Sequence, residues 1–147
     1  MKPLKSFEDY IKEGIAKKQS ADKLRARSLI IESETSYKLL LSFVKAIGLN
    51  DDSANHVIKN AYDIIMELIR AKMLSDGFST TGKGAHEAEV SYMAETGVSS
   101  RDVDFANDLR YFRNGIAYYG KKFDKAYAEK VLEFLKRMYP LLKKEAK

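Results

Sequence analysis

Apolar side chains recur at helical spacing along almost the whole chain, and only two prolines, Pro3 and Pro140, interrupt its backbone hydrogen-bonding potential. A spacing of three to four residues places apolar side chains on one face of an α-helix, whereas a half-buried strand alternates every two residues. No segment alternates with period two for long enough to predict a strand. The pattern therefore predicts an all-α protein, an antiparallel up-down bundle of four to five helices.

Apolar spacing and capping residues together locate the helices. The expected bounds are about 4–18, 21–47, 53–74, 86–95, 99–116 and 124–142, with Ser99 and Asp124 as N-caps and the glycine- and serine-rich stretch 78–85 as a loop. The first segment is a short helix or arm. We expect one domain over residues 1–147, with 1–19 as the N-terminal helix or arm and 20–147 as the bundle, because this length supports one hydrophobic core.

Composition excludes several classes of protein. The chain has no cysteine, which rules out disulfides, thiolate metal sites and cysteine nucleophiles. Its first 14 residues are charged throughout, unlike a signal peptide, and no apolar run approaches the roughly 18 residues of a membrane span. We expect a cytoplasmic protein without membrane association.

Charge is segregated along the sequence. Residues 1–27 carry 8 basic and 4 acidic side chains, residues 28–109 carry 7 and 13, and residues 110–147 carry 11 and 4. A basic surface raises the local concentration of phosphates, so the last third favours an anionic partner. The alternative is that these lysines only solvate helix faces.

The segment 108–120, Asp-Leu-Arg-Tyr-Phe-Arg-Asn-Gly-Ile-Ala-Tyr-Tyr-Gly, carries the most information about function. If its apolar residues face the core, Arg110, Arg113 and Asn114 are expected to converge on another face. The planar fork of arginine suits bidentate contact with phosphate. The alternative is that both arginines form salt bridges with acidic residues of a neighbouring helix.

Within this segment, Arg113-Asn114-Gly-Ile-Ala-Tyr118 resembles the Arg-Asn-x-x-x-His signature of the HEPN family, the higher eukaryotes and prokaryotes nucleotide-binding domains. Tyr118 stands where the family has its histidine. Residues 23–34 also resemble the first bundle helix of the family, and 77–93, with its His-Glu-Ala sequence, resembles a loop and helix start seen in many prokaryotic members.

The resemblance implies a helical bundle that forms a homodimer, with the motif segments of both subunits lining one cleft. Members with the complete motif are metal-independent ribonucleases, many of them toxins paired with a small nucleotidyltransferase antitoxin, and other members are non-catalytic binding domains. In the family's chemistry an arginine stabilises charge on the phosphate and the histidine exchanges protons with the sugar or leaving oxygen.

Tyrosine at position 118 changes this expectation, because a phenol with an ordinary pKa of about 10 is a poor general base near neutral pH. We therefore expect binding of a nucleotide or RNA phosphate without efficient catalysis. Two alternatives remain open. The chain is an active ribonuclease toxin in which Tyr118 or His86 takes the base role, or it is an interaction module that docks a nucleotidyltransferase and does not bind nucleic acid.

The catalytic candidates are thus Arg113 and Tyr118, and the ligand-binding candidates are Arg110, Arg113, Asn114, Tyr118 and Asp63. Asp63 enters because family members often present a polar residue from the preceding long helix toward the arginine, and such a partner holds the arginine in position.

We expect no metal or other cofactor, since His56 and His86, the two histidines, have no metal-ligand spacing. His86 is expected to cap or orient the short helix. The helical carboxylate pairs Asp63/Glu67 and Asp104/Asp108 are typical of ordinary helix surfaces. Among the tyrosines, we expect Tyr111 and Tyr119 in a dimer interface and Tyr118 in the cleft.

Overall fold

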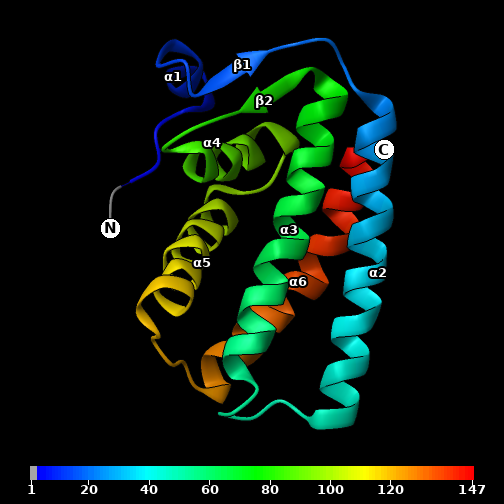
Figure 1. Ribbon diagram of the computed structural model, residues 1–147, viewed down its shortest axis with the longest axis vertical. Coiled ribbons are helices and arrows are strands. Elements are labelled where there is room, and N and C mark those ends of the chain that lie inside the picture. The colour runs from blue at the N-terminus through cyan, green and yellow to red at the C-terminus, as the bar shows by residue number, and fades with distance from the viewer. Residues whose placement is uncertain (1–2) are drawn as a thin grey trace.

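The computed structural model describes residues 3–147 and is mostly helical (Figure 1). Its elements are α1 Phe7–Lys12, β1 Ala16–Lys18, α2 Lys23–Ile47, α3 Ala54–Asp76, β2 Phe78–Thr80, α4 Ala85–Ser91, the 3-10 helix η1 Tyr92–Thr96, α5 Ser100–Tyr119 and α6 Lys125–Ala146. This helical content agrees with the prediction of an all-α protein. Residues 1 and 2 of the predicted N-terminal arm lie outside the described residues.

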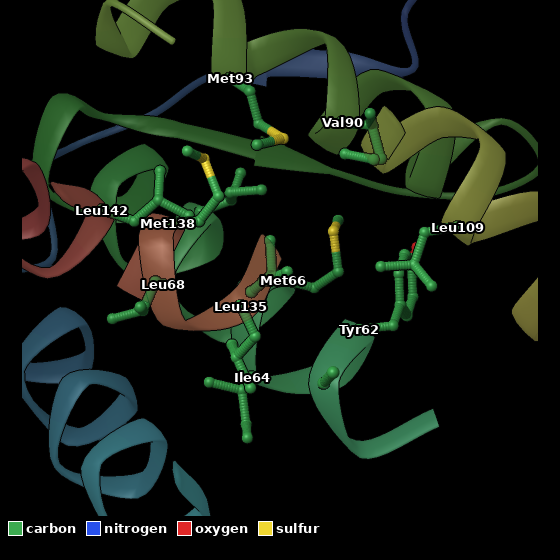
Figure 2. Close-up of a cluster of buried hydrophobic side chains, with 14 of the residues drawn as sticks. Tyr62, Ile64, Met66, Leu68, Val90, Met93, Leu109, Leu135, Met138 and Leu142 are labelled. Atoms are coloured by element: carbon green, nitrogen blue, oxygen red, sulfur yellow. The ribbon is translucent and has the colours of Figure 1, made fainter. Parts of the chain in front are cut away.

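Helix α3 is the centre of the fold. Its sequence is apolar on almost every face, which is typical of a helix enclosed by other elements. In the structure it packs against α2, α5 and α6, and α2 and α3 run in opposite directions. Figure 2 shows the resulting core cluster, which includes Ile64, Met66 and Leu68 of α3, Leu135, Met138 and Leu142 of α6, and Val90, Met93 and Leu109.

Capping side chains fix where the long helices begin. Asp22, Ser99 and Asp124 each accept a hydrogen bond from the backbone N–H three residues further on. The predicted caps Ser99 and Asp124 are therefore confirmed. Ser53 precedes α3 without capping it, because its hydroxyl donates to the carbonyl of Gly48 at 2.8 Å. The start of α5, which carries the motif, is thus determined by its own local sequence.

Two short strands contradict the expectation that the chain has no strand and that 78–85 is a loop throughout. β1 and β2 pair antiparallel, with Ala16 opposite Thr80. Three residues are too few to show an alternating pattern, so the sequence did not reveal them. Gly77 turns the chain into β2 at a left-handed φ of 87°, and the Gln19 N–H donates to its carbonyl at 2.9 Å.

Two predicted helices are shorter in the structure. The segment 4–18 is helical only as α1, because Gly14, with φ 77°, turns the chain toward β1. The segment 86–95 is α-helical as far as Ser91 and then tightens into η1. No helix within residues 3–147 combines the length and apolar character needed to cross a membrane.

Candidate functional site

The motif on α5 is divided between two faces of the helix. Arg110 contacts Glu87 of α4, and Arg113 contacts Asp63 of α3. Asn114 and Tyr118 line a surface depression near the end of α5.

Arg110 is buried rather than displayed on an open face. Its side chain is 7% exposed, and its guanidinium donates to the Glu87 carboxylate of α4 at 2.8 Å and to the Asn107 amide oxygen at 3.1 Å. The expectation that Arg110 converges with Arg113 and Asn114 on an accessible face is therefore wrong. The physical reason is that α4 packs on α5 at this point and supplies a carboxylate.

Arg113 lies against α3. Its Nη2 is 3.5 Å from a carboxylate oxygen of Asp63, the residue that the sequence pointed to as its partner, and its guanidinium carbon is 5.9 Å from the centre of the Tyr62 ring. The Nε of Arg113 is buried and has no hydrogen-bond partner among residues 3–147. Arg113 is thus held loosely, by one long ion pair to a carboxylate whose side chain is 51% exposed.

Tyr62 of α3 lies near the arginines of α5 and near the charged side chains Arg70 and Glu89. Burial raises the pKa of the Tyr62 phenol well above its usual value, and the charge of Glu89 raises it further. Its ring is 4% exposed and appears in the core cluster of Figure 2. Tyr62 is therefore a neutral, buried ring close to both groups of charged side chains.

The depression at the end of α5 has a volume of about 550 Å³ and is largely aromatic. Its lining residues are Tyr111, Phe112, Asn114, Gly115, Tyr118, Tyr119 and Lys121. Tyr118 and Tyr119 are 73% and 80% exposed, so their rings are open to solvent. The depression combines aromatic faces, one amide and one ammonium group.

Gly115 leaves room for the side chain of Lys121 at this depression. A Cβ atom at position 115 would lie 3.2 Å from the side chain of Lys121, which folds back across the helix there. The Lys121 N–H donates to the carbonyl of Gly115 at 3.2 Å, and Gly120 has a left-handed φ of 62°. These features are typical of a glycine-terminated helix end, and they place the lysine beside Asn114 and Tyr118.

A second charged cluster, formed by Arg70, Glu89 and His86, was not predicted. Glu89 is 5% exposed, and Arg70 donates to its two oxygens at 2.7 and 3.3 Å. The Nδ1 of His86 lies 3.2 Å from Glu89 Oε1, so His86 contacts its own short helix, as expected. The available signal was a glutamate between the apolar residues Ala88 and Val90, a pattern that places a carboxylate in the core.

Two further predicted groups, His56 and Glu67, also lie on α3. His56 is exposed and its ring stacks near Phe43, at 4.3 Å between centroids. Glu67 lies one turn beyond Asp63 on α3, and burial, with the nearby charges of Glu32 and Asp63, raises its pKa to about 7.

Comparisons of the chain with models of protein families, with curated proteins and with solved structures found no match.

Proposed function

We propose that the chain is a HEPN-like helical domain that binds the phosphate of a nucleotide or of single-stranded RNA at the end of α5, without efficient catalysis. The observation that carries the proposal is the depression in which Asn114 and Tyr118 of the motif lie together with Lys121. An amide, a phenol and an ammonium group all donate hydrogen bonds, and phosphate oxygens accept them.

The aromatic lining favours a ligand with unpaired bases. Tyr118 is 73% exposed beside Lys121, and an exposed ring next to a cation is the arrangement on which single-stranded nucleic acids stack. Base stacking tolerates many sequences because every base has an aromatic face. The depression is therefore expected to bind with little sequence preference.

Arg113 is the proposed second cation of the site. An exposed ion pair of this length stabilises little, so a phosphate that approaches the edge between α3 and α5 can compete with Asp63 for the guanidinium. The Nη atoms of Arg113 are the groups that such a ligand would contact, since the Nε is buried. Arg110 has a structural role here, since its bonds to α4 hold α5 in place.

A second copy of the chain is expected to complete the site. The long helices, with α3 and α5 adjacent, suit a HEPN-like up-down bundle, in which the motif segments of two subunits share a cleft. Rings as exposed as Tyr111 and Tyr119 are enriched in protein interfaces because they bury apolar area while the hydroxyl stays solvated or bonded. Light scattering should give a homodimer mass, whereas a clean monomer of 16.7 kDa would remove the shared-cleft arrangement.

The direct test is fluorescence anisotropy of a labelled single-stranded RNA at a series of salt concentrations. Tyr118→Ala should weaken binding by about 1–3 kcal/mol, the range for one stacked base. Lys121→Gln and Arg113→Gln should each make the logarithmic salt dependence shallower by about 0.7 for a lost phosphate contact.

Lys144→Gln is the matched control for these charge changes. Lys144 is exposed near the far end of α6, remote from the connection between α5 and α6. Its loss should change binding only slightly, as expected for a diffuse point charge. Equal effects of Lys121→Gln and Lys144→Gln would mean that the attraction is diffuse and that the depression is not a site. If neither RNA nor a mononucleotide binds at low salt, the interaction module is the better interpretation.

Catalysis is tested in the same preparations. The wild-type chain should cleave RNA no faster than a blank, with or without magnesium, and Tyr118→His should restore cleavage that Arg113→Ala then abolishes. Robust cleavage by the wild type would favour the ribonuclease toxin instead.

A further inference from the structure

A second depression, of about 560 Å³, lies where the first turns of α2, the last turns of α3 and strand β2 meet. None of its lining residues belongs to the depression at the end of α5. In Figure 1 this region is at the β-strand end of the molecule, whereas α5 ends near the opposite end. Its volume falls within the range of about 300–1,000 Å³ that small-molecule sites occupy.

The walls of this depression are held in place by backbone contacts. Strand β2 is paired with β1, the Asp22 N–H donates to the carbonyl of Leu74 at 2.9 Å, and the Gln19 N–H donates to Gly77. Gly77 is required for this approach, since a Cβ there would lie 2.7 Å from the carbonyl oxygen of Gln19. The surface is thus preformed rather than dependent on a mobile loop.

One side of the depression is apolar. Leu29 of α2, Met73 and Leu74 of α3, and Phe78 of β2 line it. The Phe78 ring is itself fixed by an edge contact with Phe7, at 5.3 Å between centroids. This side suits the flat or apolar part of a small molecule.

The other side carries positive charge and hydroxyl groups. Arg25 and Arg70 line this side. Ser79 and Thr80 of β2 line it as well, with Thr81, which follows the strand. The structure gives the Arg25 guanidinium no acidic partner, and the three hydroxyls no hydrogen-bond partner, within residues 3–147. The lining therefore has donors that no protein group uses.

The single carboxylate in the lining, Glu89, does not cancel this charge. Arg70 contacts both of its oxygens through Nε and Nη2, so this pair is neutral and the Nη1 of Arg70 is left available. Arg25 then contributes an uncompensated positive charge. Residues 1–27, which include Arg25 and the exposed lysines of β1, carry 8 basic and 4 acidic side chains, so the surroundings also attract anions.

We propose that this depression binds a small organic phosphate. The apolar side takes the organic part, and Arg25, the free edge of Arg70 and the hydroxyls of β2 bind the phosphate oxygens. Phosphate is favoured over a carboxylate because it offers three acceptor oxygens to a lining with two guanidinium groups and hydroxyl-bearing residues. The proposal goes beyond the site on α5 and does not depend on it.

The test is a titration of the full chain with phenyl phosphate, followed by amide chemical shifts in two-dimensional NMR. Saturable shifts should appear at Ser79–Thr81 and near Arg25. Inorganic phosphate, which lacks the apolar part, should bind about 10-fold more weakly, and phenol, which lacks the charge, should give no saturable shifts at these amides. Shifts confined to residues 111–121 would overturn the proposal, as would the absence of saturation.

Matched variants separate a site from general attraction. Arg25→Gln should weaken phenyl phosphate binding about 10-fold, in line with a charge-assisted hydrogen bond, whereas Arg27→Gln, an equal charge change two residues away and outside the lining, should leave it almost unchanged. Thr80→Val, which keeps the shape of the side chain, should also weaken binding. Equal effects at Arg25 and Arg27 would refute the proposal. RNA binding at α5 should persist in Arg25→Gln, which keeps the two sites distinguishable.

Discussion

Removing Arg70 should destabilise the protein much more than neutralising its partner Glu89. The two side chains differ in exposure, 36% for Arg70 and 6% for Glu89. Arg70→Met leaves the buried carboxylate of Glu89 with only His86 as a neighbour. Glu89→Gln leaves Arg70 charged, but a guanidinium that reaches water is solvated there and keeps an amide oxygen as acceptor.

The expected magnitudes follow from this difference. Breaking a buried pair by removing one partner costs about 3–5 kcal/mol, and the nearby His86 and the adjoining depression place Arg70→Met at the lower end, about 3 kcal/mol. Glu89→Gln exchanges a charged acceptor for a neutral one and should cost about 1 kcal/mol. The double variant Arg70→Met, Glu89→Leu should cost less than Arg70→Met alone, because it leaves no stranded charge.

Urea unfolding followed by helical circular dichroism measures all three variants against the wild type. The slope of the unfolding free energy against urea concentration should be the same for all variants, so that a shift in the unfolding midpoint reports a change in stability. The reasoning is refuted if Glu89→Gln is as destabilising as Arg70→Met, or if the double variant is the least stable of the three.

Four further variants test other parts of the structure by the same unfolding assay. Gly97→Ala, at φ 80° with open space around it, should cost about 1 kcal/mol of stability. Gly77→Ala, at φ 87°, should cost clearly more, because the new Cβ would lie 2.7 Å from the carbonyl oxygen of Gln19. Equal costs would show that the approach of Gln19 to Gly77 is not constrained. Burial raises the pKa of Glu67 to about 7, so the folded chain binds this proton more tightly than the unfolded chain does. Protonation of Glu67 therefore adds stability as the pH falls from about 7 toward the pKa of the carboxyl group in the unfolded chain. Glu67→Gln should therefore stabilise at about pH 8 by up to about 1 kcal/mol, after allowance for its partial exposure, and have no such effect near pH 4; a gain independent of pH would contradict this. Tyr127→Phe should be neutral or stabilising by about 1 kcal/mol, because the buried hydroxyl has no hydrogen-bond partner within residues 3–147, and a large loss of stability would show that it has one.

Helix positions were predictable from the sequence because long amphipathic segments and capping residues act locally. The predicted segment 21–47 agrees with α2 to within two residues, and Ser99 and Asp124 cap the helices that follow them. β1 and β2 were missed because their pairing joins residues about sixty positions apart and neither strand is long enough to alternate. The tightening of 86–95 into η1 likewise depends on how α4 packs, not on local spacing.

Side-chain placement on α5 was predictable only in part. The contact of Arg113 with Asp63 follows from two long neighbouring helices, and the open position of Tyr118 follows from the end of α5 at Gly120. The burial of Arg110 does not follow from its own sequence, since it depends on Glu87 of α4 lying against α5. A short helix that contributes a carboxylate from a separate segment changes an apparently exposed arginine into a structural one.

The arginines differ in how fully protein groups already pair with them, and so in how readily each can bind an anion. Arg110 has two short bonds and little exposure, so a ligand would have to break a buried contact to reach it. Arg113 has one long ion pair, so exchanging Asp63 for a phosphate should cost less there than at Arg110. Arg70 keeps one free edge beside a neutralised carboxylate, and Arg25 has no acidic partner within residues 3–147. Affinity for anions should therefore concentrate at Arg113 with Lys121 and at Arg25 with Arg70, which lie in separate parts of the molecule.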